Sequence, residues 1–206
     1  MGLISNGTTI FDAGALDSGL AKGAMTLIKT LTASSSGTLT FHNGTSSVVL
    51  DSTYKEYLFI FNNLHPSATD GPFLVFQANA VGASGFNETI TSTCFITFQF
   101  EDNSQSAVSY STGGDQAQGT AYQRLSQNVG GENNECVSGS LSLFDPASTV
   151  FVKHFIARAS AHADDDGNTE GYNAGYFNVT AAIDEIQFKF ASGNIDSGTI
   201  SLYGIN

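Results

Sequence analysis

Residues 174–205 constrain the fold of this chain more than any other stretch of its sequence. Apolar and polar side chains alternate there in two runs, which flank a turn made of Gly, Asn and Asp. A period of two residues indicates a strand with one face against a core, and such a turn joins adjacent strands. We therefore expect the closing hairpin of a β-sandwich in this stretch.

The same period recurs from residue 25 onward, and no helical period is sustained. The chain also contains 24 Ser, 20 Thr, 15 Asn and 22 Gly, which favour turns and solvent-facing strand positions over helix interiors. The segment 121–129 fits either a strand or a short helix. This pattern predicts an all-β fold, an antiparallel β-sandwich of jelly-roll-like form. The predicted strands are 25–33, 37–42, 46–51, 54–61, 73–79, 93–100, 108–111, 137–144, 149–159, 172–179, 183–191 and 199–205.

Local signals also predict how some strands pair. Runs 25–33 and 37–42 flank three serines and are expected to pair with each other, and runs 137–144 and 149–159 flank an Asp-Pro turn. The run 54–61 is expected to be a central strand buried on both faces. Its apolar side chains are Tyr57, Phe59 and Phe61 on one face and Leu58 and Ile60 on the other.

The first 24 residues are rich in Gly and Ala and show no sustained period. We expect a short extended N-terminal arm at 1–24, followed by a single β-sandwich domain at 25–206, a length common for one all-β domain. Such an arm frays unless it docks on its own sandwich or on a neighbouring copy. The apolar residues proposed to make these arm contacts are Leu3, Ile4, Ile10 and Phe11.

Charge and hydropathy exclude several classes of partner. The net charge is −12, and the seven basic residues are scattered rather than clustered, so a nucleic-acid groove is not expected. No apolar run is long enough to span a bilayer, and the first residues lack the pattern of a secretory signal. We expect a soluble protein made in a cytoplasm, without membrane insertion.

No motif for catalysis is visible, and the chain is not expected to be an enzyme. The four histidines lack zinc-site spacing, and there is neither a GxSxG elbow nor a glycine-rich nucleotide loop. His154 lies within an alternating run and is expected to pack or hydrogen-bond within a sheet. Cys94 and Cys136 are 42 positions apart and are interpreted as buried small side chains rather than a disulfide or metal pair.

One carboxylate cluster, at 164–170, has two interpretations. Asp164, Asp166 and Glu170 surround a glycine-containing turn, and carboxylate oxygens on such a turn are what Ca²⁺ requires. These three residues form a calcium candidate. The EF-hand spacing is not met, and a solvated loop tip between two strands explains the same residues.

Carbohydrate binding is a further hypothesis, because β-sandwiches present aromatic side chains to sugars. The tyrosines available for this role are Tyr110, Tyr122, Tyr172 and Tyr176. The absence of Trp, which has the largest stacking face, counts against it, and the same tyrosines fit strand or interface positions.

Four segments carry a resemblance to a known group of proteins. They are 3–12, 57–66 with its Asn63-Leu64-His65-Pro66 end, 138–149 and 192–204. Together they resemble small virion structural proteins of tailed bacteriophages, in particular those of marine phages. The resemblance implies a non-enzymatic virion component, and no catalytic or binding residue carries over.

Two positions in a virion agree with this resemblance. A capsid decoration protein would coat the head through contacts with its own copies and with the major capsid protein. A tail fibre or tail-appendage protein would contact tail proteins and a host surface glycan. The sequence has neither a repetitive shaft nor coiled-coil heptads, which favours decoration.

Overall fold

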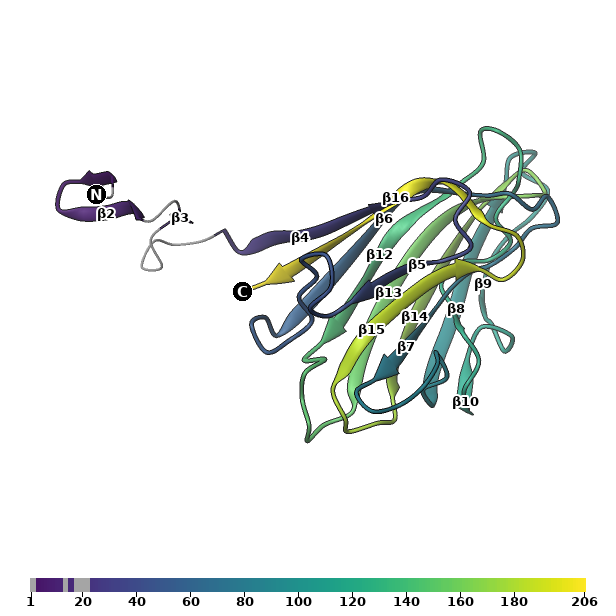
Figure 1. The fold of residues 1–206 in the computed structure, drawn as a ribbon. Coiled ribbons are helices and arrows are strands. Elements are labelled where there is room, and N and C mark those ends of the chain that lie inside the picture. Colours follow the sequence, from purple (N-terminus) through teal and green to yellow (C-terminus); the bar gives the residue numbers. More distant parts are fainter. Residues whose placement is uncertain (1–2, 13–14, 17–22) are drawn as a thin grey trace.

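The computed structural model describes residues 3–12, 15–16 and 23–206. These residues form antiparallel strands and turns without a helix, and the sandwich consists of two facing sheets (Figure 1). Across the described residues, no helix has the length and apolar character needed to span a membrane. The predicted antiparallel β-sandwich is confirmed, whereas its finer jelly-roll form stays a prediction.

The larger sheet has nine strands. Eight of them follow one another across the sheet, and β9 (Ser106–Tyr110) pairs with the same edge of β8 as β10 does. The order is β10 (Gln116–Gly119), β8 (Ile90–Phe100), β14 (Gly167–Phe177), β13 (Lys153–Ala163), β12 (Val137–Phe144), β6 (Glu56–Pro66), β16 (Ile195–Ile205) and β4 (Met25–Thr32).

The smaller sheet has four strands and covers one face of the larger sheet (Figure 1). Its order is β11 (Gln123–Arg124), β7 (Leu74–Ala80), β15 (Ile183–Phe190) and β5 (Leu39–His42). Within the part of the chain that the structure describes, no sheet covers the other face of the nine-stranded sheet.

The core lies between the two sheets and is rich in phenylalanine. Phe59 of the larger sheet lies 5.3 Å from Phe41 and 5.4 Å from Phe188 of the smaller one, measured between ring centroids. Phe76 and Phe155 make a similar contact at 5.1 Å. The Phe59–Phe41 and Phe76–Phe155 pairs are edge-to-face, a geometry that adds to the free energy gained by burying the rings. Strand alternation therefore supplies one continuous core.

The pairing predicted for the end of the chain is wrong. β15 and β16 both form, but β15 pairs with β5 and β7, whereas β16 pairs with β4 and β6. Residues 191–194 thus cross from one sheet to the other instead of closing a hairpin. Alternation shows which side chains of a strand share a face. It does not show which of the two sheets contains that strand.

The pairing of the first two predicted strands is also wrong. β4 pairs with β16 in the nine-stranded sheet, and β5 pairs with β15 in the four-stranded sheet. The serines between them carry the chain across the sandwich. Residues 46–51 form turns and coil rather than the predicted strand, although Val48 and Leu50 are buried.

The strand β6 is central, as predicted, but only one of its faces is fully buried. Tyr57, Phe59 and Phe61 have no exposed surface, whereas Leu58 and Ile60 are half-buried on the uncovered face. The hairpin of β12 and β13 is confirmed, with Leu141 opposite Ala157.

The N-terminal segment contains three short strands in a separate sheet, β1 (Leu3–Ser5), β2 (Thr8–Asp12) and β3 (Ala15–Leu16). Asn6 and Gly7 both have positive φ and form the turn between β1 and β2, an Asn-Gly hairpin signal that the sequence interpretation passed over. Of the proposed contact residues, Ile4 is exposed and Ile10 is half-buried. The side chains of Leu3 and Phe11 lie outside the described residues.

A buried polar network ties the two sheets together at their β8 and β11 edge. The fully buried Gln123 donates to the carbonyl oxygen of Gly114 at 2.6 Å and accepts from the Ser92 hydroxyl at 2.7 Å. Its amide also approaches Oδ1 of Asn173 at 3.4 Å. Buried amides need such partners, so this network fixes how the sheets meet at this edge.

Candidate functional site

The uncovered face of the nine-stranded sheet, called here the open face, carries rows of side chains that run across several strands. In one row Tyr110, Phe95, Tyr172 and Arg158 lie opposite one another on β9, β8, β14 and β13. Phe95, Tyr172 and Arg158 each adjoin buried residues in their strands, so strand periodicity points them away from the core. Tyr110 lies on the same face because it pairs with Phe95.

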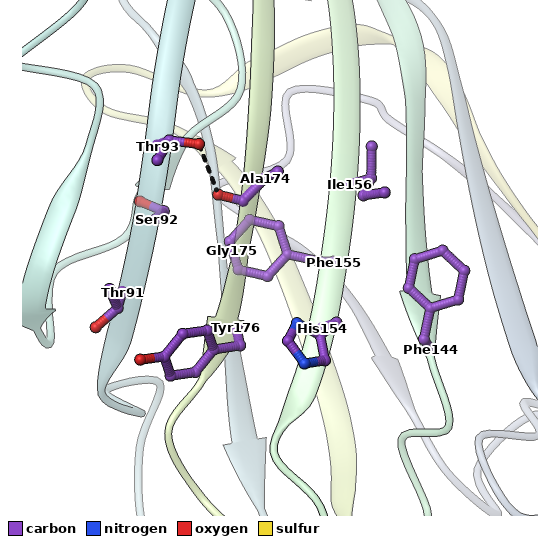
Figure 2. Close-up of a pocket in the computed structure, with 10 residues that line it drawn as sticks. All are labelled: Thr91, Ser92, Thr93, Phe144, His154, Phe155, Ile156, Ala174, Gly175 and Tyr176. Carbon is purple, nitrogen blue, oxygen red and sulfur yellow. Dashed lines mark hydrogen bonds between the residues drawn. The ribbon is translucent and has the colours of Figure 1, made fainter.

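A hollow of about 450 Å³ lies in the open face beside this row. Figure 2 shows His154, Tyr176, Phe144 and Ile156 around it, with the small Ala174 and Gly175 between them. A side chain at position 175 would meet the Thr91 carbonyl oxygen at 2.6 Å and Phe155 at 2.7 Å. Glycine is therefore required at this point of the hollow.

The polar groups of the hollow come from β8, β13 and β14. The Thr93 hydroxyl donates to the Ala174 carbonyl oxygen at 3.4 Å, and Thr91 Oγ1 accepts from the Gln118 amide at 2.6 Å. The His154 and Tyr176 rings lie 5.7 Å apart, with no hydrogen bond from the His154 nitrogens or the Tyr176 hydroxyl to another described residue. These two side chains are available to a ligand.

His154 packs against Tyr176 within the sheet, as predicted, and the structure adds the face on which it lies. The exposed His154 alternates with the buried Lys153 and Phe155, so its ring points out of the open face. The signal was present in the sequence, because the same parity places Ile156 and Arg158 on that face.

The row beside the hollow is internally bonded. Phe95 and Tyr172 stack with ring centroids 4.5 Å apart and an interplanar angle of 5°. Arg158 forms a salt bridge with Glu170 and lies over the Tyr172 ring at 5.2 Å, and the Tyr172 hydroxyl donates to Glu170 at 2.7 Å. The hydrogen bond and charge of Arg158 hold the pKa of the Glu170 carboxyl below its usual range.

The four tyrosines of the carbohydrate hypothesis separate into two groups. Tyr110, Tyr172 and Tyr176 lie on the open face. Tyr122 lies by the four-stranded sheet, where its hydroxyl donates to Gln187 at 2.5 Å and the Lys189 ammonium lies 4.4 Å from its ring centroid. The structure therefore brings together three of the four.

The residues of the calcium candidate are divided in the structure. Glu170 points its oxygens at Arg158 and Tyr172, as described above. Asp166, in the turn between β13 and β14, lies with Glu135 and His162. Among the described residues this is the only group of three such side chains close enough to share one ion, and Asp164 is not in it.

Both cysteines are free thiols. Cys94 is buried, as predicted, and its burial raises the pKa of the thiol. Cys136 is only half-buried, and burial raises its pKa as well. Thiols are the less reactive form, so neither residue has the environment of a nucleophile.

The comparisons with known proteins identify no relative. No family model matches the chain, and no curated protein or solved structure matches it either.

Proposed function

We propose that this chain is a non-enzymatic structural protein of a phage virion that coats the head as a capsid decoration protein. It would act through contacts with its own copies and with the major capsid protein, at the open face and the β4 edge. The virion assignment rests on the resemblance of the four segments described above. The proposed contact surface rests on the structure.

The observation that carries the contact surface is the distribution of exposed apolar side chains. On the described strands of the sandwich they occur in the nine-stranded sheet and in none of the four-stranded one. They are Met25, Leu27, Phe95, Val108, Tyr110 and Ile156. Apolar groups gathered on one face mark interaction surfaces, and the unpaired edge of β4 offers backbone hydrogen bonds to a neighbour.

Incorporation of tagged copies into particles during infection tests this surface. The variant Leu27→Lys/Ile156→Lys places two charges on it, while Val81→Lys changes an equally exposed apolar residue outside both sheets. We expect the double variant to be lost from purified particles and the Val81 variant to be retained. Retention of both variants would contradict the contact surface.

The copy number per particle tests the decoration role itself. A gel of purified virions is expected to show this chain in amounts comparable to the major capsid protein. A band present at the level of tail proteins would instead place it in an appendage.

A second candidate function is a tail appendage that binds a host surface glycan, and the hollow in the open face favours it. The hollow combines ring edges with two threonine hydroxyls and with His154 and Tyr176, whose polar atoms have no partner among the described residues. A sugar requires such a mixture of apolar and hydrogen-bonding groups.

A glycan array followed by titration of each hit distinguishes this candidate. Binding that Tyr176→Ala abolishes and Tyr122→Ala retains would support a site in the hollow, because Tyr122 lies by the opposite sheet. The absence of any glycan that discriminates between these two variants would leave decoration as the only candidate.

A further inference from the structure

We propose that Glu135, His162 and Asp166 form a binding site for a divalent transition-metal ion of the zinc class. The site lies at the end of the sandwich where the 130–136 loop passes β13, away from the hollow. It differs in two of its three donors from the calcium candidate read from the sequence.

The three side chains converge from separate segments. Glu135 lies in the 130–136 loop, His162 near the end of β13 and Asp166 in the turn that follows. One ligand atom from each lies within 4.8 Å of the other two. Two atoms bound to one zinc ion lie at most about 4.4 Å apart, so a small rotation of the exposed Asp166 side chain completes the arrangement.

Charge provides a second, independent argument. The Glu135 carboxylate is only 5% exposed, and a buried carboxylate is costly without a compensating positive charge. Among the described residues no Lys or Arg makes an ion pair with it, and the one basic partner is His162, at 3.2 Å. Glu101 approaches the same imidazole at 3.5 Å, so carboxylates outnumber the bases at this point.

The backbone holds the donors in place. The amide of His162 donates to the Cys136 carbonyl oxygen at 3.1 Å, and its carbonyl accepts from Gly130 at 3.0 Å. His162 is therefore bound to both ends of the 130–136 loop that carries Glu135. A Cβ at position 130 would collide with the Glu135 carboxylate, so Gly130 leaves the space which that carboxylate fills.

The donor set selects the class of metal. Calcium takes oxygen ligands and needs six to eight of them, whereas one imidazole with two carboxylates is a set that zinc accepts. Three protein donors leave a position for water or for a group from a neighbouring molecule.

Calorimetric titration of the metal-free full chain with zinc chloride tests the proposal. We expect one zinc ion per chain, an affinity that Asp166→Asn and His162→Gln each lower by more than about tenfold, and no displacement by excess calcium. Asp166 is exposed, so its variant removes a donor without disturbing the core. Circular dichroism of each variant verifies the fold.

Two matched controls complete the test. Asp165→Asn removes a carboxylate from the same turn, and His42→Gln breaks a His–Glu pair at 2.8 Å that has no third donor. Both are expected to bind zinc as the wild type does. The proposal is overturned if the wild type binds no zinc, if calcium competes equally, or if the controls lose as much affinity as the donor variants.

Discussion

The outer faces of the two sheets differ in how their side chains are partnered. On the four-stranded sheet, Glu185 accepts from His42 and Asn79, each at 2.8 Å, and Gln187 bonds to Tyr122 and Thr40. On the open face of the nine-stranded sheet, the exposed Ile156 lies beside His154 and Tyr176 (Figure 2), whose polar atoms have no hydrogen-bond partner among the described residues.

This difference indicates which outer face is suited to contact with solvent and which is suited to contact with a partner. The described strands of the four-stranded sheet expose no large apolar side chain, so covering that face offers little gain in free energy. On a face with exposed apolar side chains, a partner that covers them removes apolar surface from water and thereby lowers the free energy. The same core supports both faces, so substitutions that separate stability from binding can test the comparison.

The largest effect is expected at the network that joins the two sheets. Gln123→Leu keeps the volume of the side chain but leaves Ser92 Oγ and the Gly114 carbonyl oxygen without their partner. We expect a loss of about 3 kcal/mol in the free energy of unfolding, measured by urea denaturation. Gln99→Leu, on the open face, is the control and should change it by less than about 0.5 kcal/mol. Equal effects would mean that the network does not tie the sheets.

The next effect is a loss of stability at alkaline pH, which arises from Tyr57 on the inner face of the nine-stranded sheet. Burial, with the nearby Asp51 charge, raises the pKa of Tyr57 from 10.0 to about 12. The unfolded chain loses this proton first, so the stabilisation is complete below pH 10 and disappears as the pH rises through about 12. We expect this to contribute up to about 2 kcal/mol.

Urea denaturation at several pH values checks this prediction. The fall in unfolding free energy between pH 10 and pH 12 should be shallower in Tyr57→Phe than in the wild type. Identical slopes would show that another group dominates the alkaline transition.

A smaller difference in stability is expected between substitutions of two arginines that lie on opposite sheets. Arg124 is half-buried and lies 3.5 Å from the centroid of the Phe73 ring, whereas the Arg158 side chain is 64% exposed in its salt bridge with Glu170. We expect Arg124→Ala to cost about 1 to 2 kcal/mol of unfolding free energy and Arg158→Ala to cost less, because solvent screens its exposed salt bridge. Thermal melts of the two variants give the order, and the reverse order would break the comparison of the two faces.

The smallest effect on stability is expected on the open face itself. Ile156 is 57% exposed, so Ile156→Thr should change the unfolding free energy by less than about 0.5 kcal/mol while weakening association. Ile186→Thr, in the core, is the contrasting variant and should cost several kcal/mol. A large loss of stability in Ile156→Thr would show that the open face contributes to folding rather than to binding.

Sequence reasoning identified most strands but few of their partners across the sandwich. The alternation of β12 and β13 and the Asp-Pro turn between them were sufficient for that hairpin, because both strands lie in one sheet. The same reasoning failed for β15 and β16, whose connection has the composition of a hairpin turn. A Gly-Asn turn is compatible with pairing and with crossing, and only the rest of the core decides between them.

The candidate sites show the same division. Strand parity was enough to place Tyr172 and Tyr176 on the same side of one strand, but only the register between β13 and β14 places Ile156 on that face. Nothing in the sequence pointed to Glu135 as the neighbour of His162 and Asp166, since 27 positions separate it from His162 and no motif spacing links them. Convergence of this kind depends on how loops pass the ends of strands.

The amino-acid sequence by itself determined that this chain forms an antiparallel sandwich and which side chains of each strand share a face, because a period of two is a local property of the backbone. The tertiary structure alone decided which sheet each strand joins and which outer face remains uncovered. It also decided that the charged Lys153 is completely buried. Its ammonium donates to the carbonyl oxygens of Phe151, Val179 and Thr180. Val179 and Thr180 lie 26 and 27 positions from Lys153 in the chain, and only the packing of the folded sandwich brings them within hydrogen-bond distance.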